Sequence, residues 1–152
     1  AYKAIPAGKP RGAVVVVQEI FGVNHHIKAV ADGFAADGYV SLAPAIFDRV
    51  EPGFETGYAP ADIERGRAVR MKLSMDQMVM DVKAAVQELS KTGLKVGVVG
   101  YCLGGTMAWL AATRSRPSTG TKSARRTRSC PSTSTPAPAT ASAVTSAAAS
   151  TR

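Results

Sequence analysis

The chain has 152 residues, enough for one domain of ordinary size and too few for two. Residues 1–113 contain 12 Lys and Arg and all 11 Asp and Glu, whereas residues 114–152 contain the other 7 Lys and Arg and no acid, so +7 of the net charge of +8 lies in the tail. The nearly neutral body offers no basic stripe and the tail offers no aromatic residues for base stacking, which argues against nucleic-acid binding.

Residues 12–19 form a continuous apolar, β-branched run, typical of a strand covered on both faces in a parallel sheet. Residues 25–38 place apolar side chains on one helical face, with Asn24 as a candidate N-cap and Gly38 just past the end. Residues 39–43 predict the next strand. The three segments therefore predict a parallel strand–helix–strand unit.

The next segments repeat this alternation. Residues 44–61 are a Pro- and Gly-rich loop, and residues 62–91 are mostly helical, with a 3.6-residue apolar period in their second half. Residues 95–99 predict a third buried strand, and a helix begins directly after it. The pattern indicates an α/β class protein with a doubly wound, mostly parallel sheet.

The periodic pattern ends at residue 114. Beyond it Ser, Thr, Ala, Pro and Arg dominate, and Val144 is the only residue among Val, Ile, Leu, Met, Phe, Tyr and Trp. Such a segment cannot offset an ordering cost of ~1–2 kcal/mol per residue, so we expect residues 114–152 to be a low-complexity basic tail that is disordered, or weakly helical in its Ala-rich end. One hypothesis is that residues from about 114 onward are not the evolved continuation of the fold, because a reading-frame shift in GC-rich DNA gives this composition. The alternative is a genuine tail on a truncated homologue.

One segment, Gly100-Tyr101-Cys102-Leu103-Gly104, follows a strand, opens a helix and has the spacing of a nucleophile elbow, with Cys in place of Ser. The sharp turn requires glycine at 100 and 104 and lifts the sulfur above the sheet. There the positive end of the helix favours thiolate, and the N–H of Leu103 points to where an oxyanion would form. The alternative is a buried structural cysteine in an ordinary turn.

A second segment, residues 18–22 (Gln-Glu-Ile-Phe-Gly), follows the first buried strand. Sites in open α/β sheets are built at the carboxyl ends of the strands. Glu19 is therefore expected to face Cys102 across the crevice. The alternative is a solvated carboxylate at the end of a strand.

Together these segments resemble the dienelactone hydrolase family (carboxymethylenebutenolidases) of the α/β-hydrolase superfamily. The resemblance rests on residues 14–24, 37–49, 64–73, 81–86 and 95–109. It implies the amino-terminal half of an α/β-hydrolase domain over residues 1–113, truncated after the elbow helix. It also implies hydrolysis of a lactone or carboxylic ester through a Cys thioacyl intermediate, without metal or cofactor.

The resemblance further implies roles for individual residues. Cys102 is the nucleophile, Glu19 pairs with the resting thiol and helps to generate thiolate, and the N–H groups of Ile20 and Leu103 form the oxyanion hole. Arg67 holds a substrate carboxylate, with a solvated helix-face arginine as the alternative.

The sequence departs from the family in its acid–base groups, which the family places after the elbow. No Asp, Glu or His follows residue 102, and His25 and His26 lie upstream, where an exposed pair at a helix start is favoured over a rescue role. We therefore expect impaired activity, because a thiol nucleophile needs an oriented base. Two alternatives stay open: a non-catalytic homologue with a reactive cysteine, and nucleic-acid binding through the tail.

The expected setting follows from simple features. Two cysteines make no disulfide framework, and no apolar run approaches the ~18–20 residues of a membrane span. We expect a cytoplasmic monomer whose partner is a small-molecule lactone or ester, with no membrane attachment.

Overall fold

A computed structural model describes residues 1–114. The remainder, which holds all of the predicted tail except Arg114 and includes Cys130, lies outside the described residues. The elements in chain order are β1 (Tyr2–Ala4), β2 (Gly12–Val17), α1 (His25–Ala36), β3 (Tyr39–Ala43), the short 3-10 helix η1 (Ile46–Arg49), α2 (Pro60–Met71), α3 (Met75–Ser90), β4 (Val96–Gly100) and α4 (Leu103–Thr113).

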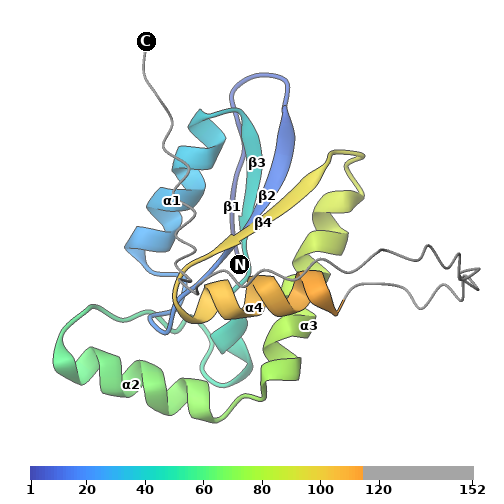
Figure 1. Ribbon diagram of the computed structural model, residues 1–152. Coiled ribbons are helices and arrows are strands. Elements are labelled where there is room, and N and C mark those ends of the chain that lie inside the picture. The colour runs from blue at the N-terminus through green and yellow to red at the C-terminus, as the bar shows by residue number, and fades with distance from the viewer. Residues whose placement is uncertain (115–152) are drawn as a thin grey trace, which may run out of the picture. The chain divides into compact units, whose positions relative to one another are not determined.

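The strands form one sheet in the order β1-β3-β2-β4 (Figure 1). β2 pairs in parallel with both β3 and β4, and β1 pairs antiparallel with β3. The predicted mostly parallel α/β sheet is confirmed. The antiparallel β1 has no clear periodic signal because it is only three residues long.

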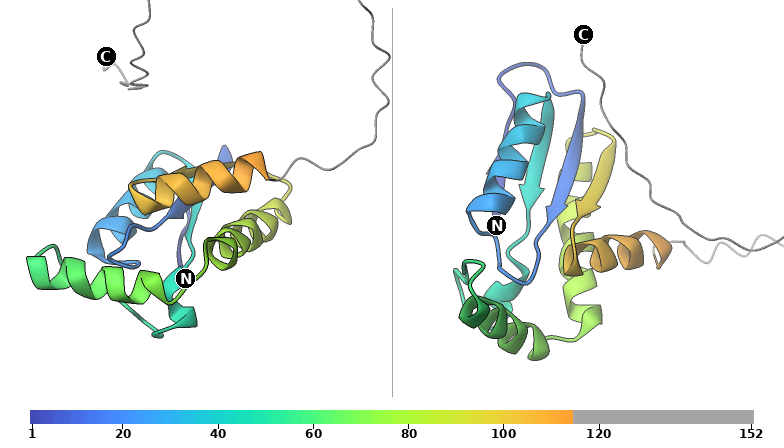
Figure 2. Two further views of the ribbon diagram at one scale, coloured as in Figure 1. Left: turned by 60° about the horizontal axis from the view of Figure 1, so that its bottom comes forward. Right: turned by 60° about the vertical axis from the view of Figure 1, so that its left-hand side comes forward.

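Helices cover both faces of this sheet (Figure 2). Val16 of β2 packs in a cluster with Ile27 and Ala31 of α1. Val15 and Val17 point to the opposite face and pack in a second cluster with residues of α3 and α4. The alternation of side chains along a strand thus explains why a fully apolar run was needed for β2.

The ends of α1 follow the expected capping pattern. The Asn24 Oδ1 accepts a hydrogen bond from the N–H of Ile27 at 3.2 Å. Gly38 adopts φ +90°, a conformation that L side chains rarely adopt, and ends the helix. Both positions fix how the chain leaves and re-enters the sheet.

The region 62–91 is two helices rather than one. α2 ends at Met71 and α3 begins at Met75, with a reciprocal cap between them: the Ser74 hydroxyl accepts from the N–H of Gln77, and the Gln77 side chain accepts from the N–H of Ser74. In the described part of the chain, no helix is long and apolar enough to cross a membrane.

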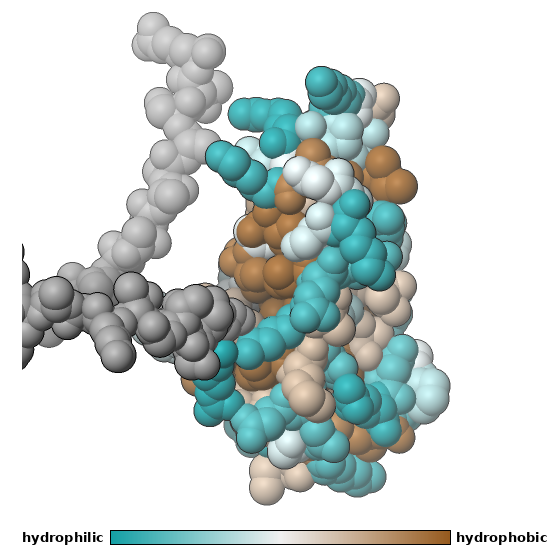
Figure 3. Space-filling model, turned by 90° about the vertical axis from the view of Figure 1, so that its right-hand side faces the viewer, coloured by the Kyte–Doolittle hydropathy of each residue, from teal (hydrophilic) through white to brown (hydrophobic). Residues whose placement is uncertain are grey.

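β4 is one edge of the described sheet, since within residues 1–114 it pairs only with β2. Two hollows of about 480 and 550 Å³ adjoin this edge, one on the α3 side and one beside Trp109 of α4. Figure 3 shows apolar side chains gathered on this side of the molecule. Trp109 is 70% exposed there.

Candidate functional site

The carboxyl ends of β2 and β4 meet at one edge of the sheet. Val17 and Gly100, the last residues of these neighbouring parallel strands, are partners in the register. Glu19 and Cys102 each follow two residues later, as Ile20 and Leu103 each follow three residues later. The structure thus brings the two predicted segments to the same edge, as expected for an open α/β sheet.

Cys102 lies in the turn between β4 and α4. It is exposed, it is the N-cap residue of α4, and it is the only non-glycine residue with positive φ in residues 1–114, at φ +51° and ψ −121°. Its carbonyl accepts hydrogen bonds from the N–H groups of Gly105 and Thr106 at 3.1 and 3.4 Å. A strained residue held by its helix is the geometry of a nucleophile elbow.

Both flanking glycines are required by contacts rather than by their own dihedrals. A Cβ on Gly100 would lie 2.3 Å from the carbonyl oxygen of Gly104. A Cβ on Gly104 would lie 2.4 Å from the carbonyl oxygen of Val17 and 2.6 Å from that of Gln18. The small residue at 104 therefore lets α4 begin directly against the end of β2, which brings the elbow close to the segment carrying Glu19.

The segment after β2 is a tight turn held by a buried amide. Glu19 and Gly22 form an isolated antiparallel bridge. Gln18 is 0% exposed, its Oε1 accepts from the N–H of Ile46 at 3.0 Å, and its Nε2 donates to the carbonyl of Glu19 at 3.3 Å. A buried amide whose groups are paired fixes a local conformation, because breaking either bond leaves a polar group unsatisfied.

The turn is also held by backbone contacts from distant parts of the chain. A Cβ on Gly22 would lie 2.1 Å from the carbonyl oxygen of Phe54, and a Cβ on Gly66 would lie 2.3 Å from that of Ile20. The N–H of Thr56 donates to the carbonyl of Phe21 at 3.1 Å. Sequence reasoning did not find these contacts, although a glycine in the middle of a helix, as at 66, is a recognisable signal of close approach.

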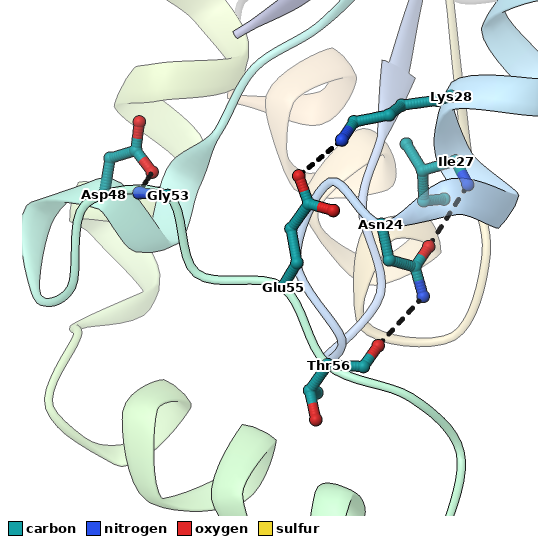
Figure 4. A network of polar contacts seen from close by, with 7 residues as sticks. All are labelled: Asn24, Ile27, Lys28, Asp48, Gly53, Glu55 and Thr56. Carbon is teal, nitrogen blue, oxygen red and sulfur yellow. Dashed lines mark hydrogen bonds and ion pairs between the residues drawn. The ribbon is translucent and has the colours of Figure 1, made fainter.

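The loop around Phe54 and Thr56, which contacts this turn, is also bonded to the start of α1 (Figure 4). Glu55 forms an ion pair with Lys28, with 2.5 Å between the carboxylate and Nζ. The Nδ2 of Asn24 donates to the carbonyl of Thr56 at 3.3 Å. The Asp48 carboxylate accepts from the N–H of Gly53 and closes the other end of the loop. The loop therefore links the turn that holds Glu19 to the start of α1.

Several polar groups at this edge have no partner among residues 1–114. The N–H groups of Ile20 and Leu103 make no hydrogen bond there, and neither the Glu19 carboxylate nor the Cys102 thiol makes one. Glu19 is half-buried. A carboxylate, a thiol and two backbone donors are thus left available at one edge of the sheet.

Arg67 is paired elsewhere. It lies on the exposed face of α2, where its Nη1 is 2.7 Å from a carboxylate oxygen of Glu64, and both side chains are more than 60% exposed (65% and 71%). The structure therefore does not bring Arg67 into contact with Cys102 or Glu19. In this arrangement it is a helix-face arginine with a local partner.

His25 and His26 are exposed at the start of α1, as the sequence predicts. They border an open hollow of about 350 Å³ together with Glu55 and Tyr58. Within residues 1–114, no group of three or more His, Cys, Asp and Glu side chains gathers in a way that could hold a metal ion.

A mostly parallel sheet covered by helices on both faces, with a strained turn between a strand and a helix, is typical of an α/β-hydrolase type of protein. The model of the dienelactone hydrolase family matches residues 1–125. The chain belongs to this family of hydrolases.

Individual relatives agree with the family. The carboxymethylenebutenolidase of Pseudomonas putida is 37% identical over 116 residues, which is 72% of this chain and 48% of that protein. A Synechocystis protein assigned as a carboxymethylenebutenolidase is 44% identical over 103 residues, covering 65% of this chain and 42% of its own length. The chain therefore spans about half the length of the curated relatives it matches.

A solved structure gives the same result. The crystal structure of a protein from Klebsiella pneumoniae subsp. pneumoniae, assigned as a dienelactone hydrolase, matches with a TM-score of 0.61 and 29% identity. The match covers 73% of this chain and 47% of the Klebsiella protein. The similarity thus extends over nearly all of the residues described here.

Proposed function

We propose that the chain carries the acylating half of a lactone or carboxylic ester hydrolase, with Cys102 as the nucleophile. The observation that carries the proposal is the positive φ of Cys102 at the strand-to-helix turn, beside the turn that holds Glu19. A side chain is kept in such a conformation where its orientation matters, since the backbone strain costs about 1–3 kcal/mol.

In the proposed reaction, the Glu19 carboxylate accepts the thiol proton and the Cys102 sulfur attacks the carbonyl carbon. The carbonyl electron pair moves to oxygen, where the N–H groups of Ile20 and Leu103 stabilise the negative charge. The ring C–O bond then breaks and the leaving oxygen takes the proton back, so that a thioester to Cys102 remains. Water finally adds to this thioester and releases the carboxylic acid and the thiol.

The resemblance implies that an Asp and a His after the elbow provide the oriented base for the last step, and no Asp, Glu or His occurs there in these 152 residues. Deacylation without an oriented base is slow. We therefore propose that the chain by itself is acylated once and turns over poorly. The resemblance-based role of Arg67 as a substrate-carboxylate anchor requires that the substrate displace Glu64 from its present ion pair.

A single-turnover experiment tests the nucleophile. With Cys130→Ser as the background, so that Cys102 is the only thiol, p-nitrophenyl acetate should release about one equivalent of p-nitrophenolate in a burst. The acetyl group should then be found on the peptide that carries Cys102. Cys102→Ala should abolish the burst, and Glu19→Gln should slow it about a hundredfold if the carboxylate acts as base. No burst, or an acetyl group at another residue, would refute the proposal.

A further inference from the structure

One glycine lies in the interior of a helix where its own backbone does not require it. Gly66 is in the middle of α2, where glycine is less favourable than alanine. Gly66 and Val69 are the two buried residues of this helix. A Cβ on Gly66 would meet the carbonyl oxygen of Ile20 at 2.3 Å and its carbonyl carbon at 3.2 Å.

Not every glycine inside a helix makes such a contact. Gly33 occupies the interior of α1, is exposed, and a Cβ built on it meets nothing within 4 Å. Gly66 therefore allows the backbone of α2 to touch the backbone of the turn at Ile20. The carbonyl and the N–H of Ile20 are separated by only two soft dihedrals, so a contact that holds the carbonyl also limits where the N–H points.

A second contact also holds this turn, and it comes from the side chain of Gln18. The buried Gln18 amide donates to the carbonyl of Glu19, which belongs to the same peptide group as the N–H of Ile20. Its Oε1 is in turn held by the N–H of Ile46. Because a peptide group is planar, fixing this carbonyl fixes the direction of the Ile20 N–H on its opposite side.

We propose that Gly66 and Gln18 are positioning residues that hold the Ile20 N–H in the orientation that stabilises an oxyanion formed at Cys102. This inference rests on the proposed function. Neither residue touches the reacting atoms. Each acts on the peptide groups on either side of Ile20, Gly66 through close backbone approach and Gln18 through a buried hydrogen bond.

Two reagents distinguish a loss of oxyanion positioning from general damage to the site around Cys102. Acylation by p-nitrophenyl acetate forms a C–S bond, places charge on the carbonyl oxygen and then expels p-nitrophenolate, so it benefits from oxyanion donors. Alkylation by iodoacetamide forms a C–S bond and expels iodide without any oxyanion. A residue that positions an oxyanion donor should therefore change the first rate and leave the second unchanged.

The experiment uses the full chain with Cys130→Ser. Gly66→Ala should lower the rate of acylation at Cys102 about tenfold, less than the loss of a whole oxyanion donor, while the alkylation rate stays within about twofold. Gly33→Ala, the matched helix-interior glycine, should change neither rate. Val69→Ala loosens the same buried face of α2 without adding an atom at Ile20, and it should also leave the ratio of the two rates unchanged.

Should circular dichroism show that Gly66→Ala is unfolded, Gln18→Met provides the same test through the second contact. An unchanged ratio of acylation to alkylation in the folded variant overturns the inference, as does an equal fall in Val69→Ala. If the parent chain is not acylated at Cys102 at all, the proposed function itself fails. Acylation of the parent with an unchanged ratio in the variant refutes only the positioning role.

Discussion

Cys102 is held in a conformation that suits glycine better than cysteine. Its φ of +51° costs about 1–3 kcal/mol for a residue with a Cβ, whereas glycine adopts it freely. Glycine also gives the unfolded chain more conformational freedom, which disfavours folding by roughly 0.5–1 kcal/mol and offsets part of this difference. We therefore expect Cys102→Gly to stabilise the fold by about 1 kcal/mol and to raise the melting temperature by about 4 °C.

Cys102→Ala is the control for this prediction, since it removes the sulfur but keeps the Cβ and the strain. Its melting temperature, measured by circular dichroism, should stay below that of Cys102→Gly. An equal or higher value for the alanine variant would mean that the elbow is not strained. The gain in Cys102→Gly would come with complete loss of acylation, as expected where a site stores strain.

The glycine at position 104 is predicted to be irreplaceable for a steric reason. Its Cβ would meet two carbonyl oxygens of the β2 end below 3 Å, and neither is the end of a flexible side chain. Gly104→Ala should therefore destabilise the fold by about 3 kcal/mol, through forced displacement of α4. Gly97→Ala in β4, where a Cβ meets nothing within 4 Å, should be close to neutral. Urea unfolding curves of the two variants compare them directly, and similar midpoints would contradict the prediction.

At the scale of elements, the start of α2 is held by a carboxylate. Asp62 accepts from the Thr56 hydroxyl at 2.5 Å and from the N–H of Ala59 at 3.1 Å. The hydrogen bond from Thr56, followed by that from Ala59, lowers the pKa of Asp62 below its ordinary value. A lowered folded-state pKa contributes stability above the unfolded value, about 3.9, and that stability is lost as the pH falls below it.

Asp62→Asn should therefore melt at a lower temperature than the parent chain at neutral pH, and the difference should shrink as the pH is lowered below about 4. Melting curves at several pH values check this. Glu64→Gln, on the exposed face of the same helix, is the matched control and should show a smaller difference at neutral pH. A gap for Asp62→Asn that stays constant down to pH 3 would contradict the prediction.

Elements with strong local signals were predicted well. The apolar run of β2, the capping residues Asn24 and Gly38, and the glycine spacing around Cys102 each reflect one local physical requirement. The break between α2 and α3 was missed, although Ser74 and Gln77 have the Ser-x-x-Gln spacing of a capping box. That pattern was hidden because the apolar period of α3 extends up to the break.

Contacts that join distant segments had no periodic signature and could not be predicted. Gly22 against Phe54 and Gly66 against Ile20 are contacts of single backbone atoms, and nothing in the residues around them specifies a partner. The ion pair of Arg67 with Glu64 differs from these contacts, because it joins opposite charges three residues apart on one helix. The substrate-binding role that the resemblance implies for Arg67 stays a prediction.

At the scale of the whole chain, the outer edge of β4 presents a surface that favours self-association. Within the described residues this edge is unpaired, the strand itself carries no charge, and Trp109 is exposed beside it. Unpaired apolar edges recruit other chains, and a buried Trp contributes a large apolar area to such a contact. The matched segment makes up less than half of the relatives named above, which therefore contain further residues outside it.

We therefore predict that the mean molecular mass of the chain, measured by light scattering, rises with protein concentration, in contrast to the monomer expected from the sequence. Trp109→Lys places a charge at the edge and should reduce this rise. Met71→Lys makes a similar change at an exposed residue of α2, which runs along the bottom of Figure 1 and does not border β4, and it should not reduce the rise. A constant monomer mass, or equal effects of the two substitutions, would show that the β4 edge does not drive association.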